Sequence, residues 1–523
     1  MIIRRFTGAA PRALRPSIFL SGWLVAAPAF AADADITAGV NAPAADEASA
    51  DSSGQLSTIV VTARRLNVAR TEIETQTGAS TYKITSDAIA ATPGGENVQM
   101  NQVLLQAPDV VQDSFGQLHV RGDHNDLQYR LNGIILPEGI SVFSQTLSPR
   151  LISSLSLITG ALPAEYGLRT AGIVDLTTNS GLLQPGGSVS LYGGSFGTFE
   201  PAVEYGGNTG HLSYYVSFDY KQDKVGIESP DGSANPLHDH TKQLHGFGYF
   251  ENIVDENNRL SLILGTSDDA FQIPNQRGLQ PGLGLTVNGQ TTFLSDDLNE
   301  TQHEAAQYAI VSWQHAAGAL NWQTSLSARY TTLHFAPDLL GDLLYNGIAQ
   351  DAYKSDTAFG WQTDGSYKWN DAHTVRAGFY IQHDSAKSNT TSRVLPLDPV
   401  TGVPTTDVPE AIVDNGSQSQ SLESVYLQDE WQVLKPLTIN YGLRFDHYSA
   451  YSNGSQLSPR VNFVWELAEG TTVHGGYSRY FTPPPFELIG SPTLAKFLNT
   501  TALPPGSVTL DDSPIAARAN YYD

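Results

Sequence analysis

Residues after Gly181 alternate regularly between hydrophobic and polar positions. In residues 211–221, for example, the even positions are apolar or aromatic and most of the odd positions are polar. Because successive side chains of a strand point to opposite faces, this alternation predicts β-strands with one apolar and one polar face. A soluble sandwich would turn the apolar face inward, whereas a transmembrane barrel turns it toward lipid. The alternation recurs in residues 260–266, 439–447 and 460–467.

The lengths of the connections favour the barrel. Short and long connections alternate along residues 182–523, which predicts turns at one rim and long loops at the other, as in outer-membrane barrels. About thirteen strands are expected, with the beginning of another at 516–523. The short connections are expected at 207–210, 255–258, 317–318, 370–372, 435–436 and 469–470, and the long ones at 222–240, 268–301, 336–350, 388–416 and from 482 onward.

Residues 98–179 predict a different kind of structure, a small mixed α/β module. Met100, Val103, Leu104 and Ala107 have the spacing of one helix face. Short strand-like runs follow, and Asn132-Gly133 between two of them is a strong signal for a two-residue hairpin turn.

The N-terminal residues predict export. Residues 1–31 have a positive start, an apolar run and an Ala29-Phe30-Ala31 cleavage signal, as in a secretory signal peptide. Residues 32–55 are rich in Ala, Asp and Ser without apolar periodicity, which predicts a flexible linker.

Residues 56–65 predict an extended segment, because Thr58 to Thr62 are all β-branched. Such a segment can add as an edge strand to the sheet of another protein. It can equally be the first strand of the following module, and the residues alone leave both possibilities open.

Composition restricts the function classes. The net charge of −24 argues against nucleic acid as a partner and against a polybasic membrane-surface protein. The chain contains no cysteine, which excludes disulfides and thiolate metal sites. No HExxH, Walker or GxSxG motif is present, so neither an enzyme nor a bound cofactor is expected.

Several blocks of the sequence resemble TonB-dependent outer-membrane receptors. STIVVTA, residues 57–63, looks like the TonB box of that family. LLQAPDVV, HVRG, YRLNGIIL and LITGALPAEYGLRTAGIVDLTT are similar to its plug blocks and occur in the same order. YLQDEWQV, LSPRVNFVWEL and YSRYFTPPPFEL are similar to recurring strands of its barrel. The resemblance covers residues 56–523.

The resemblance implies a transmembrane β-barrel (residues 182–523) that holds an α/β plug (residues 66–181) in its lumen. It also implies energy-coupled uptake across the outer membrane of a scarce small ligand, such as a ferric siderophore. TonB of the inner membrane is then a partner, as is outer-membrane lipid. The alternative is a passive binding or adhesion barrel that never engages TonB. The implied TonB-box residues are Ser57, Thr58, Ile59, Val60, Val61, Thr62 and Ala63.

The same resemblance places the loop around Arg121 toward the ligand, with Arg121, Asp123, His124 and Asn125 as candidates. Considered alone, Arg121 and Arg130 could also form salt bridges inside the plug or face the barrel wall.

Two further expectations concern a metal and the extent of the chain. His238 and His240 are a weak candidate pair for a metal, although a solvated polar loop is the favoured interpretation. Receptors of this family have 22 strands, so the chain is expected to be truncated by roughly eight strands. The alternative is a complete barrel of about 14 strands.

Overall fold

A computed structural model describes residues 47–523 of the chain, and residues Ser52–Asp523 form one compact unit. The predicted signal peptide and the predicted linker up to residue 46 lie outside the described residues. The ranges within 47–523 that are not described are 76–77, 114–116, 125–126, 140–145, 170, 231, 234, 485–493 and 508–514.

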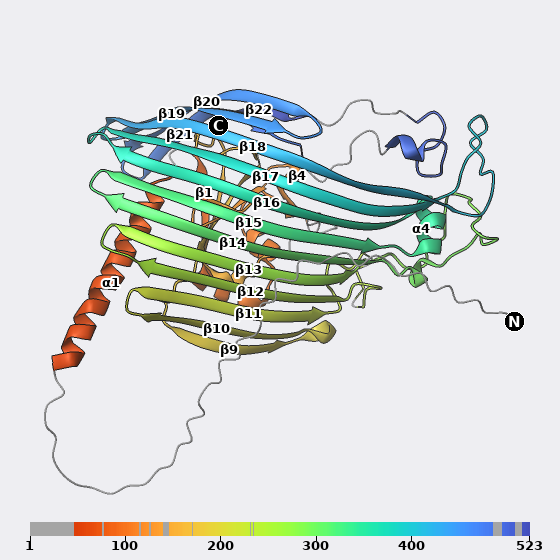
Figure 1. The fold of residues 1–523 in the computed structure, drawn as a ribbon, viewed down its shortest axis with the longest axis horizontal. Helices are drawn as coiled ribbons and strands as arrows, with labels where there is room; N and C mark the ends of the chain where they lie inside the picture. The colour runs from red at the N-terminus through yellow and green to blue at the C-terminus, as the bar shows by residue number, and fades with distance from the viewer. Residues whose placement is uncertain are drawn as a thin grey trace, which may run out of the picture. The chain divides into compact units, whose positions relative to one another are not determined.

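The dominant element is a 14-stranded antiparallel sheet in which each strand pairs with its sequence neighbours (Figure 1). Among the described residues, β9 and β22 are the edges of this sheet and no pairing joins them. The strands are β9 (Gly186–Gly193), β10 (Phe199–Thr209), β11 (Leu212–Asp223), β12 (Thr241–Ile253), β13 (Asn258–Gln272), β14 (Thr301–Ala317), β15 (Leu320–Ala336), β16 (Ile348–Lys368), β17 (His373–Val394), β18 (Glu410–Leu434), β19 (Leu437–Ser449), β20 (Asn453–Ala468), β21 (Thr471–Thr482) and β22 (Ala517–Tyr522).

The predicted short turns are confirmed, because six strand pairs are joined at the expected positions. Long connections leave the opposite rim, and one of them carries helix α4 (Leu339–Asn346). The loop predicted at 388–416 is wrong in extent: Val394 pairs with Glu410, so β17 and β18 continue beyond the rim and leave only residues 395–409 between them. Polar Ser and Thr residues in this stretch concealed the continuation of the ladder.

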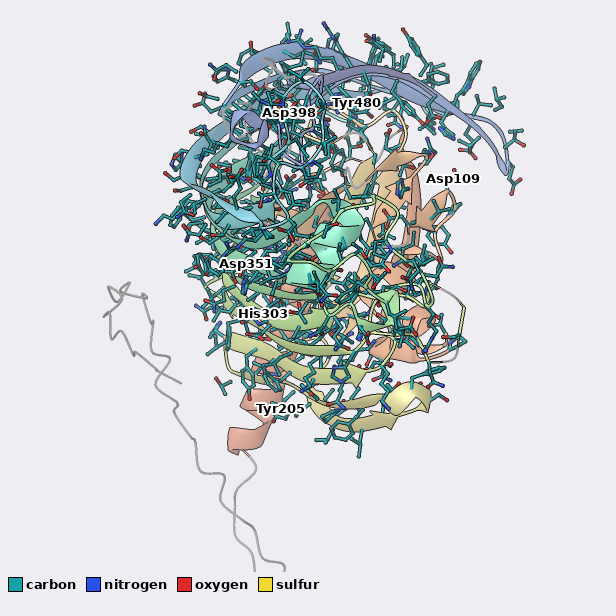
Figure 2. The ribbon with its side chains drawn as sticks, turned by 90° about the vertical axis from the view of Figure 1, so that its right-hand side faces the viewer. Asp109, Tyr205, His303, Asp351, Asp398 and Tyr480 are labelled. Atoms are coloured by element: carbon teal, nitrogen blue, oxygen red, sulfur yellow. The ribbon has the colours of Figure 1, made fainter. Side chains whose placement is uncertain are left out.

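The two faces of the sheet settle the choice between sandwich and barrel. In β14, Gln302, Glu304 and Gln314 are buried on the concave face, whereas Val311 and Trp313 are exposed on the convex face. The apolar face therefore points outward, as lipid contact requires. Viewed along the strands, the sheet curves around the module formed by the preceding residues (Figure 2).

That module is the predicted mixed α/β plug. Its five-stranded sheet has the order β1-β7-β8-β5-β6, formed by β1 (Ser80–Thr85), β5 (Leu127–Leu131), β6 (Ile134–Ile135), β7 (Ile152–Thr159) and β8 (Gly172–Thr178). A second sheet consists of β2 (Val110–Gln112), β3 (Leu118–Val120) and β4 (Asp123–His124). The remaining elements are α2 (Ser86–Ala90), α3 (Met100–Leu104) and two 3₁₀ turns, η1 (Gly95–Asn97) and η2 (Pro149–Leu151).

Local predictions for the plug are confirmed except for the end of the predicted helix, which stops at Leu104, so that Ala107 is buried but lies beyond it. Met100, Val103 and Leu104 lie on α3 and are almost completely buried in the plug core. Asn132 and Gly133 have φ values of 54° and 79° and join β5 to β6, as the primed hairpin turn requires.

The extended conformation predicted for residues 56–65 is wrong, because these residues belong to helix α1 (Glu47–Thr71). The linker prediction is also wrong from Glu47 onward. Ile59, Ala63 and Leu66 recur at helical spacing and pack against Leu182, Ile253 and Ala316 of the barrel segment. This burial outweighs the strand preference of the β-branched residues.

None of the described helices is long and apolar enough to cross a membrane.

Candidate functional site

A buried ionic network organises the centre of the plug. The Arg130 guanidinium is paired with the Glu74 carboxylate, and it also donates to Gln128 Oε1 (3.0 Å) and to the carbonyl oxygen of Glu165 (3.2 Å). Its Cζ lies 4.7 Å from the ring centroid of Tyr166. The salt bridge inside the plug that the sequence left open for Arg130 is therefore confirmed. Burial raises the pKa of Glu74, and the charge of Arg130 opposes this rise.

Polar side chains of the barrel wall hold the adjacent plug loop, residues 161–165. Arg460 donates to the carbonyl oxygens of Leu162 (3.2 Å) and Pro163 (2.7 Å). Arg444 donates to those of Ala164 and Glu165, each at 3.3 Å. At this loop, the contact between plug and wall is thus formed by hydrogen bonds to main-chain carbonyls, a kind of contact that water can replace.

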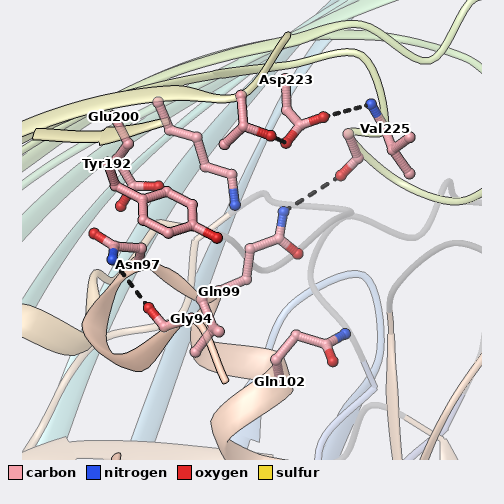
Figure 3. A pocket seen from close by; sticks show the side chains of 12 residues that line it. Gly94, Asn97, Gln99, Gln102, Tyr192, Glu200, Asp223 and Val225 are labelled. Carbon is pink, nitrogen blue, oxygen red and sulfur yellow. Dashed lines mark hydrogen bonds between the residues drawn. The ribbon is translucent and has the colours of Figure 1, made fainter. Parts of the chain in front are cut away.

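A polar cavity lies between the plug and the wall strands β9–β11 (Figure 3). Its volume is about 260 Å³. It lies near the rim of the long loops, because Phe199 begins β10 and Asp223 ends β11 there. The plug contributes Asn97, Gln99 and Gln102 to its lining, and the wall contributes Tyr192, Glu200, Lys221 and Asp223.

The charged groups of this cavity differ in their partners. Asp223 accepts hydrogen bonds from Thr198 Oγ1 (2.6 Å) and from the backbone N–H of Val225 (2.8 Å). Glu200 is 97% buried, and within the described part of the chain its Oε2 has no hydrogen-bond partner. Gln99 donates to the carbonyl oxygen of Gly226 (3.3 Å), which ties the plug to the loop after β11. The cavity therefore offers a carboxylate and several amides to a small polar group.

The ligand-facing candidates from the sequence are not part of this cavity's lining. Arg121 lies in the turn between β3 and β4 with a φ of 53°. Its Nε lies 3.9 Å from an Asp109 carboxylate oxygen, and its guanidinium donates to the Tyr521 hydroxyl. Asp123 and His124 form β4, and Asn125 lies outside the described residues. The cavity residues could not be predicted from the sequence, because isolated amides and charges on separate elements carry no local pattern.

The two candidate metal ligands are engaged in separate contacts. His238 Nδ1 lies 3.0 Å from Asn275 Oδ1, and the backbone N–H of His240 donates to Gln272 Oε1 (3.2 Å). In the described ranges, no group of three or more His, Cys, Asp or Glu side chains is placed to hold a metal ion.

Asp239, between these histidines, anchors the loop after β11. Its Oδ1 accepts from the backbone N–H of Ile227 (2.7 Å), and burial raises the pKa of its carboxyl to about 7. The raised pKa means that the folded loop favours protonated Asp239, so this contribution to stability is present at low pH and lost as pH rises through about 7.

We therefore expect the Ile227 amide to be better protected at pH 5.5 than at pH 8. Hydrogen exchange, corrected for the intrinsic effect of pH, measures this protection. The Asp239→Asn variant should lose the pH dependence, since its side chain stays neutral. Equal protection of the unmodified chain at both pH values would contradict the assignment.

The segment resembling a TonB box lies at the rim of the short turns. Gln314 of β14 donates to the carbonyl oxygen of Leu66 (2.6 Å), and Arg259 of β13 donates to Asn67 Oδ1 (2.6 Å). Arg65 donates to the carbonyl oxygens of Glu256 and Ala316. Ile59 and Ala63 are buried on the same side of α1, whereas Val61 is exposed. The cavity and this helix thus lie near opposite rims.

Comparison with known proteins gives consistent results. The family model described as TonB dependent receptor-like, beta-barrel, matches residues 266–514. The iron-regulated outer membrane virulence protein of Vibrio cholerae serotype O1 is 41% identical over 59 residues, which cover 11% of this chain and 9% of that protein.

Solved receptors share the fold. The ferric yersiniabactin uptake receptor FyuA from Yersinia pestis superimposes with a TM-score of 0.60 at 13% identity, covering 79% of this chain and 67% of FyuA. The ferripyoverdine receptor of the outer membrane of Pseudomonas aeruginosa gives a TM-score of 0.61 at 13% identity, covering 80% of this chain and 59% of that receptor. The chain thus spans about three fifths to two thirds of these receptors. The chain thus has the plug-and-barrel fold of these receptors, and its residues 266–514 match the TonB-dependent receptor barrel family.

Proposed function

We propose that this receptor takes up a small extracellular ligand across the outer membrane in a TonB-dependent, energy-coupled manner. The observation that carries the proposal is the arrangement of one plug between a polar cavity at the loop rim and α1 at the turn rim. A ligand is bound from outside and a pulling partner acts from the periplasm, so the two functions belong at opposite rims. A ferric siderophore or a similar metal chelate is the proposed ligand, by analogy with the ferric yersiniabactin and ferripyoverdine receptors.

The proposed mechanism has three steps. The ligand first contacts the long loops and the outer end of the plug. Residues 57–63 then leave the wall and pair with TonB as an added strand, through their backbone groups. TonB finally pulls on the plug, and hydrogen bonds such as those from Arg460 to Leu162 and Pro163 are exchanged for water. The energy comes from the inner membrane, so the receptor itself needs no nucleotide site.

Export to the outer membrane completes the proposal. Residues 1–31 act as a cleaved signal peptide and residues up to Asp46 as a periplasmic tether. The family is one of receptors and transporters, and no catalytic step is assigned to the chain.

Uptake measurements test the proposal. Cells that produce the full-length receptor as their only route for a ferric chelate should accumulate labelled iron, and removal of TonB should abolish accumulation while surface binding persists. Accumulation that continues without TonB would instead support the passive barrel.

A further inference from the structure

On the outward face of the barrel, an apolar groove contains three polar side chains that contact one another, Asp429, His373 and Tyr441. The groove has a volume of about 880 Å³ and lies on β17–β19 beside two short turns. We call it the Asp429 groove, defined by Trp369, His373, Leu427, Asp429, Tyr441 and Leu443. It is separate from the cavity between plug and wall and independent of ligand uptake.

Asp429 occupies an outward position on β18. Its neighbours on the same face, Val425, Leu427 and Trp431, are exposed hydrophobic residues. A carboxylate on a lipid-facing surface is unfavourable unless partners compensate its charge. His373 Nδ1 (2.7 Å) and the Tyr441 hydroxyl (2.9 Å) both contact Asp429 Oδ2. Oδ1 is buried and, among the residues that the structure describes, has no hydrogen-bond partner, and the Asp429 side chain as a whole is 15% exposed.

Aromatic side chains surround this carboxylate. The rings of His373 and Trp431 are stacked, with centroids 5.6 Å apart and an interplanar angle of 10°. Trp369, at the end of β16, is 71% exposed, and Tyr441 is also exposed. A carboxylate among aromatic rings is the combination that recognises an ammonium group, through charge and through cation–π attraction.

The depth of the groove determines what can reach it. Trp369 and Asn370 belong to the turn between β16 and β17, and Lys435 lies in the turn between β18 and β19. Short turns of outer-membrane barrels face the periplasm, so the groove lies at the headgroup level of the inner leaflet, where Trp and Tyr are enriched. At this depth the molecules in contact with the barrel are phospholipids.

We propose that the Asp429 groove binds a phospholipid whose headgroup ends in a primary ammonium. The ammonium pairs with Asp429, and an acyl chain follows Leu427 and Leu443. A lipid with only a negative headgroup lacks the group that compensates Asp429. Headgroup selection at one outward site is therefore a property of this barrel beyond its proposed transport function.

Native mass spectrometry of the full chain, purified from membranes in a mild detergent, tests the proposal. Phosphatidylethanolamine and phosphatidylglycerol with identical acyl chains are offered together. The unmodified chain should retain the ethanolamine lipid over the glycerol lipid by on the order of tenfold, the effect of one charge-assisted contact. Asp429→Asn should lose this preference. Glu423→Gln is the matched control, because Glu423 is an exposed carboxylate on the same strand outside the groove.

A lipid variant tests the same contact without changing the protein. Acetylation of the ethanolamine nitrogen removes its charge and should abolish the preference in the unmodified chain. Equal retention of both lipids, a preference that survives in Asp429→Asn, or undiminished binding of the acetylated lipid would each overturn the proposal.

Discussion

Replacement of Arg130 by leucine is expected to lower the free energy of unfolding of the plug by about 3–5 kcal/mol, the usual effect of removing one partner from a buried ion pair. Arg130 is 98% buried and is the ion-pair partner of Glu74. Without it, the carboxylate of Glu74 and the main-chain oxygen of Glu165 lose a donor inside the plug. The smaller apolar side chain offers these oxygens no hydrogen bond.

Urea unfolding followed by hydrogen exchange of the β5 and β8 amides measures this effect. Lys83→Leu is the control, because Lys83 is an exposed cation on β1 of the same module, and its effect should stay within about 0.5 kcal/mol. Adding Glu74→Gln to Arg130→Leu should restore part of the loss, since no unpaired carboxylate then remains. Equal effects of the Arg130 and Lys83 variants would show that the network contributes little.

The loss of stability caused by Arg130→Leu is expected to depend on pH. The folded plug raises the pKa of Glu74 through burial, so this group contributes stability at low pH that is lost as pH rises through the folded pKa. Arg130 opposes the rise, and its removal raises the pKa further. The difference between Arg130→Leu and the unmodified chain should therefore be smaller at pH 5 than at pH 8.

The sequence predicted the barrel well because its signal is periodic and local. Alternation with a period of two defines the strands, and the turns at Gly210, Gly318 and Gly470 adopt positive φ values that glycine tolerates. The plug hairpin at Asn132-Gly133 was predictable for the same reason. Each of these features depends on neighbouring residues in the chain.

The conformation of α1 and the composition of the cavity depend on distant residues. Thr58 to Thr62 favour a strand when considered alone, yet Ile59 and Ala63 gain burial against Ile253 and Ala316 only as a helix. Gln99 and Glu200 line the same cavity because the curved sheet surrounds the plug, and neither residue's own segment predicts this proximity. The plug and the barrel strands could therefore be predicted from the sequence, whereas the residues that line the cavity between them could not.

The helical conformation of residues 57–63 bears on the proposed pairing with TonB. Full burial of an isoleucine side chain contributes about 1.5–3 kcal/mol, and Ile59 is almost fully buried against the wall. Pairing with TonB as a strand requires residues 57–63 to leave this site, so the docked helix limits how often the segment is available. Ligand binding would have to weaken this docking for uptake to depend on occupancy.

Deletion of Ser57–Ala63 is accordingly expected to reduce uptake to the rate of cells that lack the receptor, with ligand binding at the cell surface unchanged. The deletion removes the backbone groups proposed to pair with TonB, whereas the polar cavity lies near the other rim. Deletion of Ala48–Gly54, also seven residues and upstream in the same helix, is the matched control and should preserve uptake. Labelled-chelate accumulation and binding to chilled cells separate the two steps. Uptake that survives the first deletion would show that TonB does not act through residues 57–63 and would favour a barrel that admits its ligand passively.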